Sequence, residues 1–256
     1  LTNKAYLELK PIFNTQEYRD YRKIDWNRIS DKDDFEFDNW QEYYTIKSED
    51  LKENFTCKSM EDFNGFLTTV DNFQSIRDSS HSQIDNSLEV VLSENFNRNN
   101  KLGLAFLEAY LKKNYDIRCL HRTISTIVVH SEEDALKLWE LLEDWDNKNS
   151  IYWKLTFLER LPDEFVNDAY YERLIHTIKS IDRYAYLYVN QYNKFSKENR
   201  NVVKEVLEIV HSKIKTESRQ IKISEYPFKD ALELFENDYD LIKESYFQQF
   251  TLAKSS

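Results

Sequence analysis

The chain has 256 residues and a net charge of −11 at pH 7, and it holds only two glycines and three prolines. So few glycines exclude the hairpin turns of an all-β protein and the phosphate-binding loops of Rossmann and P-loop enzymes, while 15% aromatic residues exclude a disordered chain. What remains is an all-α protein whose negative charge disfavours nucleic acid and anionic lipid as partners.

Residues 1–96 are expected to form an N-terminal helical segment with irregular spacing. One helix is expected near 14–29, and a second carries an aromatic stripe of Phe37, Trp40 and Tyr44. Ser59 is expected to cap a third helix, and a polar break at 78–82 separates it from a fourth. Their expected core stripes are Phe63, Phe66, Leu67, Val70 and Phe73 in the third, and Ile84, Leu88, Val91 and Leu92 in the fourth.

The pattern becomes regular in residues 97–256, which we expect to form a helical-repeat region. Each interval between breaks holds two apolar helical stretches, and such a period is typical of helix–turn–helix arrays. We therefore expect an α-solenoid-like stack of antiparallel helix pairs, with a globular α-helical bundle as the alternative. The breaks lie 32, 31 and 34 residues apart, at Asn99, Ser131, Pro162 and Ser196. The expected pairs are 99–130, 131–161, 163–195 and 197–215.

Each helix of this region is expected to bury one stripe of side chains. Ser131 followed by Glu132, Glu133 and Asp134 is typical of a helix start, where acids face the positive end of the helix dipole. Pro162 is expected to open another helix, because proline is tolerated in a first turn. The expected buried positions are Leu104, Leu107, Leu136, Trp139, Leu142, Leu158, Ile178, Val206 and Val210.

The helix pairs of 99–215 resemble degenerate HEAT or TPR-type repeats in pattern, although none carries the full TPR signature. The acidic, tryptophan-bearing pairs and the run Ala-Leu-Glu-Leu-Phe-Glu-Asn-Asp-Tyr-Asp at 231–240 resemble the helical C-terminal regions of bacterial STAND-type NTPases. That resemblance implies a sensor or scaffold segment whose ATPase lies elsewhere in a longer protein. A residue bias toward Asn, Lys, Ile, Tyr and Phe is also typical of an AT-rich microbial genome.

Residues that could carry chemistry are few. Glu172 and His176 lie four apart on one expected helix face and could share a metal, but a site needs three or four ligands. Cys119 and His121 lie two apart in an expected helix and point to different sides, so they do not form a nucleophile–base pair. No Arg–His spacing matches the pattern of HEPN ribonucleases. We therefore assign no catalytic, cofactor-binding or metal-ligating residue and no cofactor, and expect no enzyme activity from this segment.

The stretch 194–222 is richer in Lys and Arg than the rest, and it follows tyrosines at Tyr184, Tyr188 and Tyr192. Aromatics beside basic groups could stack on and neutralise a single strand. A tyrosine core stripe beside a solvated helix face is the favoured interpretation, because acidic residues are interleaved with the basic ones.

The expected function is a non-catalytic scaffold or sensor segment that binds a protein partner. A nucleic-acid-contacting helical domain and an enzyme without a recognisable motif are the alternatives. No small-molecule substrate is evident from the sequence.

No membrane is expected as a partner, because the longest apolar run, at 127–129, is far shorter than the roughly 18–20 residues of a span. Cys57 and Cys119 give no disulfide framework, which favours a cytoplasmic location. The chain starts at Leu1 and has Met60 as its only methionine, so we expect a fragment of a longer protein.

Overall fold

The computed structural model describes residues 15, 23–26, 40–74, 83–113, 117, 119–147, 149–181, 194 and seven positions between 201 and 209. Within these residues every regular element is a helix, which confirms the predicted all-α class. The helix expected at 14–29 lies mostly outside the described residues. Phe37, Val210, the run at 231–240 and the side chain of Phe73 also lie outside what the structure describes.

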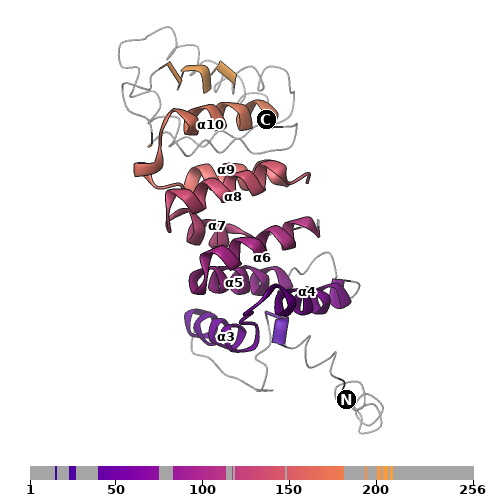
Figure 1. Cartoon of the computed structure of the whole chain (residues 1–256). Coiled ribbons are helices and arrows are strands. Elements are labelled where there is room, and N and C mark those ends of the chain that lie inside the picture. Colours follow the sequence, from indigo (N-terminus) through magenta and orange to yellow (C-terminus); the bar gives the residue numbers. More distant parts are fainter. Residues whose placement is uncertain are drawn as a thin grey trace, which may run out of the picture. The chain divides into compact units, whose positions relative to one another are not determined.

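Contacts divide the chain into two compact units, Leu1–Asn149 and Ser150–Ser256. The expected division into 1–96 and 97–256 does not coincide with these units and stays a prediction. The helices of the first unit that the structure describes (Figure 1) are α3 (Trp40–Asn54), α4 (Met60–Gln74), α5 (Gln83–Arg98), α6 (Asn100–Lys112), α7 (His121–Val128) and α8 (Glu132–Asp144). Those of the second unit are α9 (Ser150–Arg160), the short 3-10 helix η1 (Asp163–Phe165) and α10 (Asp168–Ser180).

In the first unit, alternate helices pack on one another in two rows. The odd row runs from α3 to α5 to α7, and the even row from α4 to α6 to α8. The rows are joined where α5 packs against α6 and α7 packs against α8. Figure 1 shows α5 with α6 and α7 with α8 as successive layers. Because α5 contacts α3, α6 and α7, it lies at the centre of this unit.

A tight corner joins α5 to α6. Asn99 is the single residue between them, and its side chain caps α6 by accepting a hydrogen bond from the Leu102 N–H at 3.1 Å. Gly103 then lies so close to α5 that a Cβ on it would be 2.3 Å from the Cα of Phe96. The expected pairing of 99–130 as one helix pair is therefore wrong: α6 packs against α5, because the polar break at Asn99 is the corner within a pair rather than the boundary between two pairs.

Most of the predicted core positions are confirmed. The third and fourth expected helices are α4 and α5, and every expected stripe residue that the structure describes in them is buried. The Phe63 and Phe106 rings stack with centroids 4.4 Å apart and join α4 to α6. Other buried positions predicted from the sequence are Leu104, Leu107, Trp139, Leu142, Leu158, Ile178 and Val206.

Three residues predicted in helical stripes, on α8 and α3, are exposed instead. Leu136 is 40% exposed, because α8 turns Leu138 inward beside Trp139 instead. Trp40 is 61% exposed and Tyr44 37% exposed, so they do not form a buried stripe. The buried face of α3 instead carries Tyr43, Lys47, Ser48 and Leu51.

Helix starts follow capping chemistry, with one correction. Ser59 and Ser131 are N-caps as predicted, since their hydroxyls accept hydrogen bonds from the N–H groups of Asp62 and Asp134, both at 3.1 Å. Pro162 does not open a long helix. It precedes only η1, and α10 starts later because Asn167 is its N-cap and accepts from the Tyr170 N–H at 3.2 Å. In this second unit α10 packs against α9.

Candidate functional site

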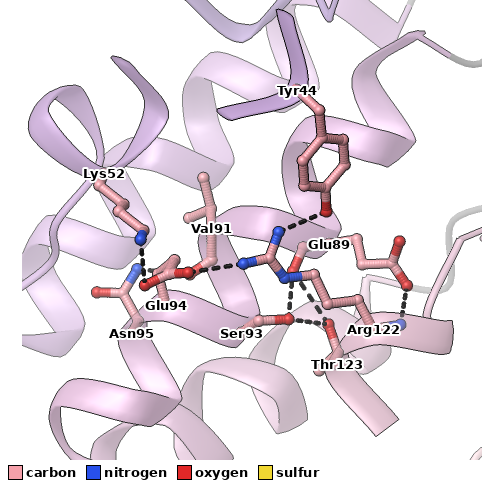
Figure 2. A network of polar contacts seen from close by, with 9 residues as sticks. All are labelled: Tyr44, Lys52, Glu89, Val91, Ser93, Glu94, Asn95, Arg122 and Thr123. Carbon is pink, nitrogen blue, oxygen red and sulfur yellow. Dashed lines mark hydrogen bonds and ion pairs between the residues drawn. The ribbon is translucent and has the colours of Figure 1, made fainter. Parts of the chain in front are cut away.

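Arg122, in the first turn of α7, is the centre of a polar network that joins three helices (Figure 2). Its guanidinium donates to the Tyr44 hydroxyl of α3 at 2.5 Å and to the Glu94 carboxylate of α5 at 2.8 Å. Lys52 of α3 lies 3.3 Å from the other Glu94 oxygen. Glu94 is thus held between two cations, and the network ties α3 and α7 to α5.

Glu89 of α5 extends this network to the start of α7. The N-cap position of α7 is Leu120, whose side chain makes no capping hydrogen bond. Glu89 supplies the missing acceptor, because its carboxylate receives the Arg122 N–H at 2.5 Å. Burial raises the pKa of the Glu89 carboxyl, although this bond and the Arg122 charge favour the anion. Each charge named here faces a partner, so the arrangement is suited to holding helices together rather than to chemistry.

Neutral side chains complete the network on α5. The Ser93 and Thr123 hydroxyls lie 3.3 Å apart, and each donates to the Glu89 carbonyl, at 2.7 and 3.2 Å. Asn95 binds the loop after α3, accepting from the Cys57 N–H at 2.9 Å and donating to the Phe55 carbonyl at 3.1 Å. Buried backbone groups of this loop are thereby satisfied by one α5 side chain.

His130, Ser131 and Asp134 bring together the residue types of a hydrolase triad, but in the wrong order. Both the His130 Nδ1, at 2.7 Å, and the Ser131 hydroxyl, at 2.8 Å, bind the same Asp134 oxygen. A nucleophilic serine needs the histidine as its base, and here the aspartate stands in that place. Asn100 donates to the same carboxylate at 3.1 Å, so the cluster joins the start of α8 to α6.

Asp134 is held as an anion by these neighbours. Burial alone would raise the pKa of its carboxyl, but hydrogen bonds from Asn100, Ser131 and His130 outweigh burial and lower that pKa. The cluster is a helix-capping device with a structural role.

An open cleft of about 330 Å³ lies where the C-terminal ends of α6 and α8 meet, and we call it the α6–α8 cleft. Its apolar lining consists of Leu111 and Trp145, both buried, and Leu141, half-buried. Its polar lining consists of Glu108, Lys112, Asp144 and Asp146. A cleft with apolar walls and a charged rim is the usual form of a recognition site.

The charges of this cleft are unequal in sign. Lys112 is the cation of its lining, and its Nζ lies 2.5 Å from a Glu108 oxygen. Asp144 and Asp146 are both exposed, and the last turn of α8 holds no basic residue to balance them. No sequence motif predicts these residues as a site. The available signal was a helix that ends in acidic residues, where the dipole favours cations.

The residues singled out from the sequence for chemistry are not brought together. Cys119 lies before α7 rather than inside a helix, because α7 begins only at His121. The Cys119 thiol donates to Asn86 at 3.2 Å. Glu172 and His176 lie exposed on α10. In the described part of the chain, no three His, Cys, Asp or Glu residues are close enough to hold a metal ion.

Little of the basic stretch 194–222 lies within the described residues, and the three tyrosines before it lie outside them. Lys194 is described, and its side chain is only 7% exposed. It donates to the Leu161 carbonyl and lies 3.0 Å from an Asp163 oxygen. This lysine binds its own unit and is not presented to a nucleic acid.

Among the residues that the structure describes, no helix combines the length and apolar character needed to cross a membrane.

Comparison of this chain with protein-family models, with curated proteins and with solved structures found no match. The resemblance to HEAT, TPR and STAND-type proteins therefore stays a prediction.

Proposed function

We propose that this chain is a non-catalytic, helical-repeat scaffold or sensor segment that binds a protein partner. The observation that carries the proposal is the α6–α8 cleft, which is open and combines apolar walls with an unbalanced negative rim. Its volume of about 330 Å³ suits one or two side chains of a partner.

The packing of the first unit supports the repeat part of the proposal. Odd helices stack on odd helices and even helices on even ones, as in arrays of stacked helix pairs. Such arrays present the ends and faces of successive helices as one extended surface, which suits peptides and proteins as ligands. The cleft lies at the ends of two successive helices of the even row, α6 and α8.

The proposal is tested by selecting peptides from a displayed random library on the full chain and measuring the affinity of the synthetic peptides by fluorescence anisotropy. Leu141→Trp fills the cleft, whereas Leu136→Trp places the same side chain at an exposed position of the same helix. We expect Leu141→Trp to weaken binding at least about tenfold and Leu136→Trp to leave it unchanged, because bulk inside a preformed site excludes the ligand. Recovery of no binding peptide, or equal effects of the two substitutions, would contradict the proposal.

A further inference from the structure

We propose that the α6–α8 cleft binds an arginine side chain of the partner. This inference rests on the proposed function, since it names the chemistry that the partner presents to the cleft. It follows from two features of the site: the charge at the end of α8 and the apolar walls.

The charge at the end of α8 runs against the helix dipole. The start of α8 carries Glu132, Glu133 and Asp134, where acidic groups are stabilised. Its end carries Asp144, followed closely by Asp146, where the free carbonyl groups already concentrate negative charge. Two carboxylates of the cleft lining thus lie at the negative end of α8. A cation that enters the cleft offsets this unfavourable charge.

In the described part of the chain, the lining of this cleft supplies one cation. Lys112 lines the cleft, but Glu108 lies 2.5 Å from its ammonium group and already pairs with it. Asp144 and Asp146 are left to act on the solvent and on any ligand. Two exposed carboxylates at a concave surface form an attractive site for one external cation.

The walls select a cation that has an apolar body. Leu111 and Leu141 can cover the aliphatic stem of a long basic side chain. Trp145 offers an aromatic ring, on which a planar guanidinium stacks better than an ammonium does. A guanidinium also matches carboxylates through paired hydrogen bonds. Arginine therefore fits the cleft better than lysine.

The size and lining of the cleft indicate a side chain rather than a free ion as its ligand. A bare metal ion fits less well, because three of the seven lining residues are apolar and offer no ligand.

The test uses the full chain labelled with ¹⁵N at its tryptophan indoles, with the Trp145 signal assigned from Trp145→Phe. The probes are the N-acetyl N-methylamides of arginine, lysine and citrulline, the last being a neutral analogue of arginine. We expect arginine to shift the Trp145 signal saturably, lysine to bind more weakly and citrulline to leave the signal in place. The double substitution Asp144→Asn/Asp146→Asn should weaken arginine binding at least about fivefold.

A charge-matched control separates a local site from general attraction to an acidic chain. Glu49→Gln/Glu53→Gln removes the same charge from exposed positions on α3 and should leave the affinity unchanged. The inference is overturned if citrulline acts like arginine, if all tryptophan signals move together, or if the two double variants behave alike. If selected peptides bind while the arginine probe does not, this inference fails and the proposed function stands. If the probe binds but no peptide is selected, only the proposed function fails.

Discussion

The centre of α5 and the ends of α6 and α8 use charged residues in opposite ways. Around α5, Glu94 lies between Lys52 and Arg122, and the network joins three helices. In the α6–α8 cleft, Asp144 and Asp146 stand exposed on the unfavourable end of a helix dipole. Charges that are matched internally serve the fold. Charges left unmatched at a concave surface are available to a ligand.

The largest expected effect comes from the corner between α5 and α6. Gly103→Ala should destabilise the chain by about 3 kcal/mol or more, because the new Cβ would lie 2.3 Å from the backbone of Phe96 and force α6 away from α5. Gly65→Ala on α4 is the matched control, since a Cβ there meets open space. It should stabilise by up to about 1 kcal/mol through helix propensity. Urea unfolding measures both, and similar values for the two would refute this account of the corner.

A smaller loss is expected where the network around α5 is cut. Arg122→Ala should cost about 1–3 kcal/mol, because it removes the hydrogen bonds to Tyr44 and Glu94 and leaves a largely buried carboxylate with fewer partners. Arg160→Ala, at an exposed position in the last turn of α9, should change stability by less than about 0.5 kcal/mol. Equal losses in the two variants, again by urea unfolding, would show that the network does not support the fold.

A pH effect is expected from the cluster at the start of α8. The folded-state pKa of Asp134 lies below its ordinary value of 3.8, so its contribution to stability is present above that value and is lost as the pH falls through the folded pKa. Asp134→Asn should therefore lose less free energy of unfolding than the unsubstituted chain between pH 5 and 3. The comparison requires denaturant titrations at both pH values. Parallel losses in the two proteins would speak against a stabilising Asp134 anion.

The smallest expected effect has the most informative sign. Asp144→Asn should raise stability by about 0.3–1 kcal/mol, because it removes a negative charge from the negative end of α8. Glu132→Gln, at the opposite end of the same helix, should lower stability by a similar amount. Thermal and urea unfolding at low salt measure the pair. If both substitutions destabilise, Asp144 has a folding role that the dipole argument omits.

Much of the fold could be predicted from the sequence, because helical periodicity and caps are local properties. Ser59 and Ser131 were identified as caps, and the stripes of α4 and α5 were placed on the buried side. The pairing of helices could not be predicted in this way, because it depends on contacts between different helices. A polar break such as the one at Asn99 looks the same in the sequence whether it lies within a helix pair or between two pairs. Only the close approach of Gly103 to Phe96 shows that α6 pairs with α5.

The α6–α8 cleft was missed for a related reason. Its walls come from two helices about thirty residues apart, and no short motif joins Leu111 to Trp145. Its one sequence signal is the pair of acidic residues at the end of α8. This placement is unfavourable for the helix dipole and matches no familiar binding motif. Such departures from local preference are where binding sites are to be sought.

The most direct test of the central claim measures unfolding with and without the arginine probe, in the unsubstituted chain and in Asp144→Asn/Asp146→Asn. A ligand that binds only the folded state raises the unfolding midpoint. We expect the double variant without probe to be at least as stable as the unsubstituted chain. We expect the probe to raise the midpoint of the unsubstituted chain more than that of the double variant. A double variant less stable by more than about 1 kcal/mol, or equal shifts in both proteins, would contradict the claim that these carboxylates serve binding rather than folding.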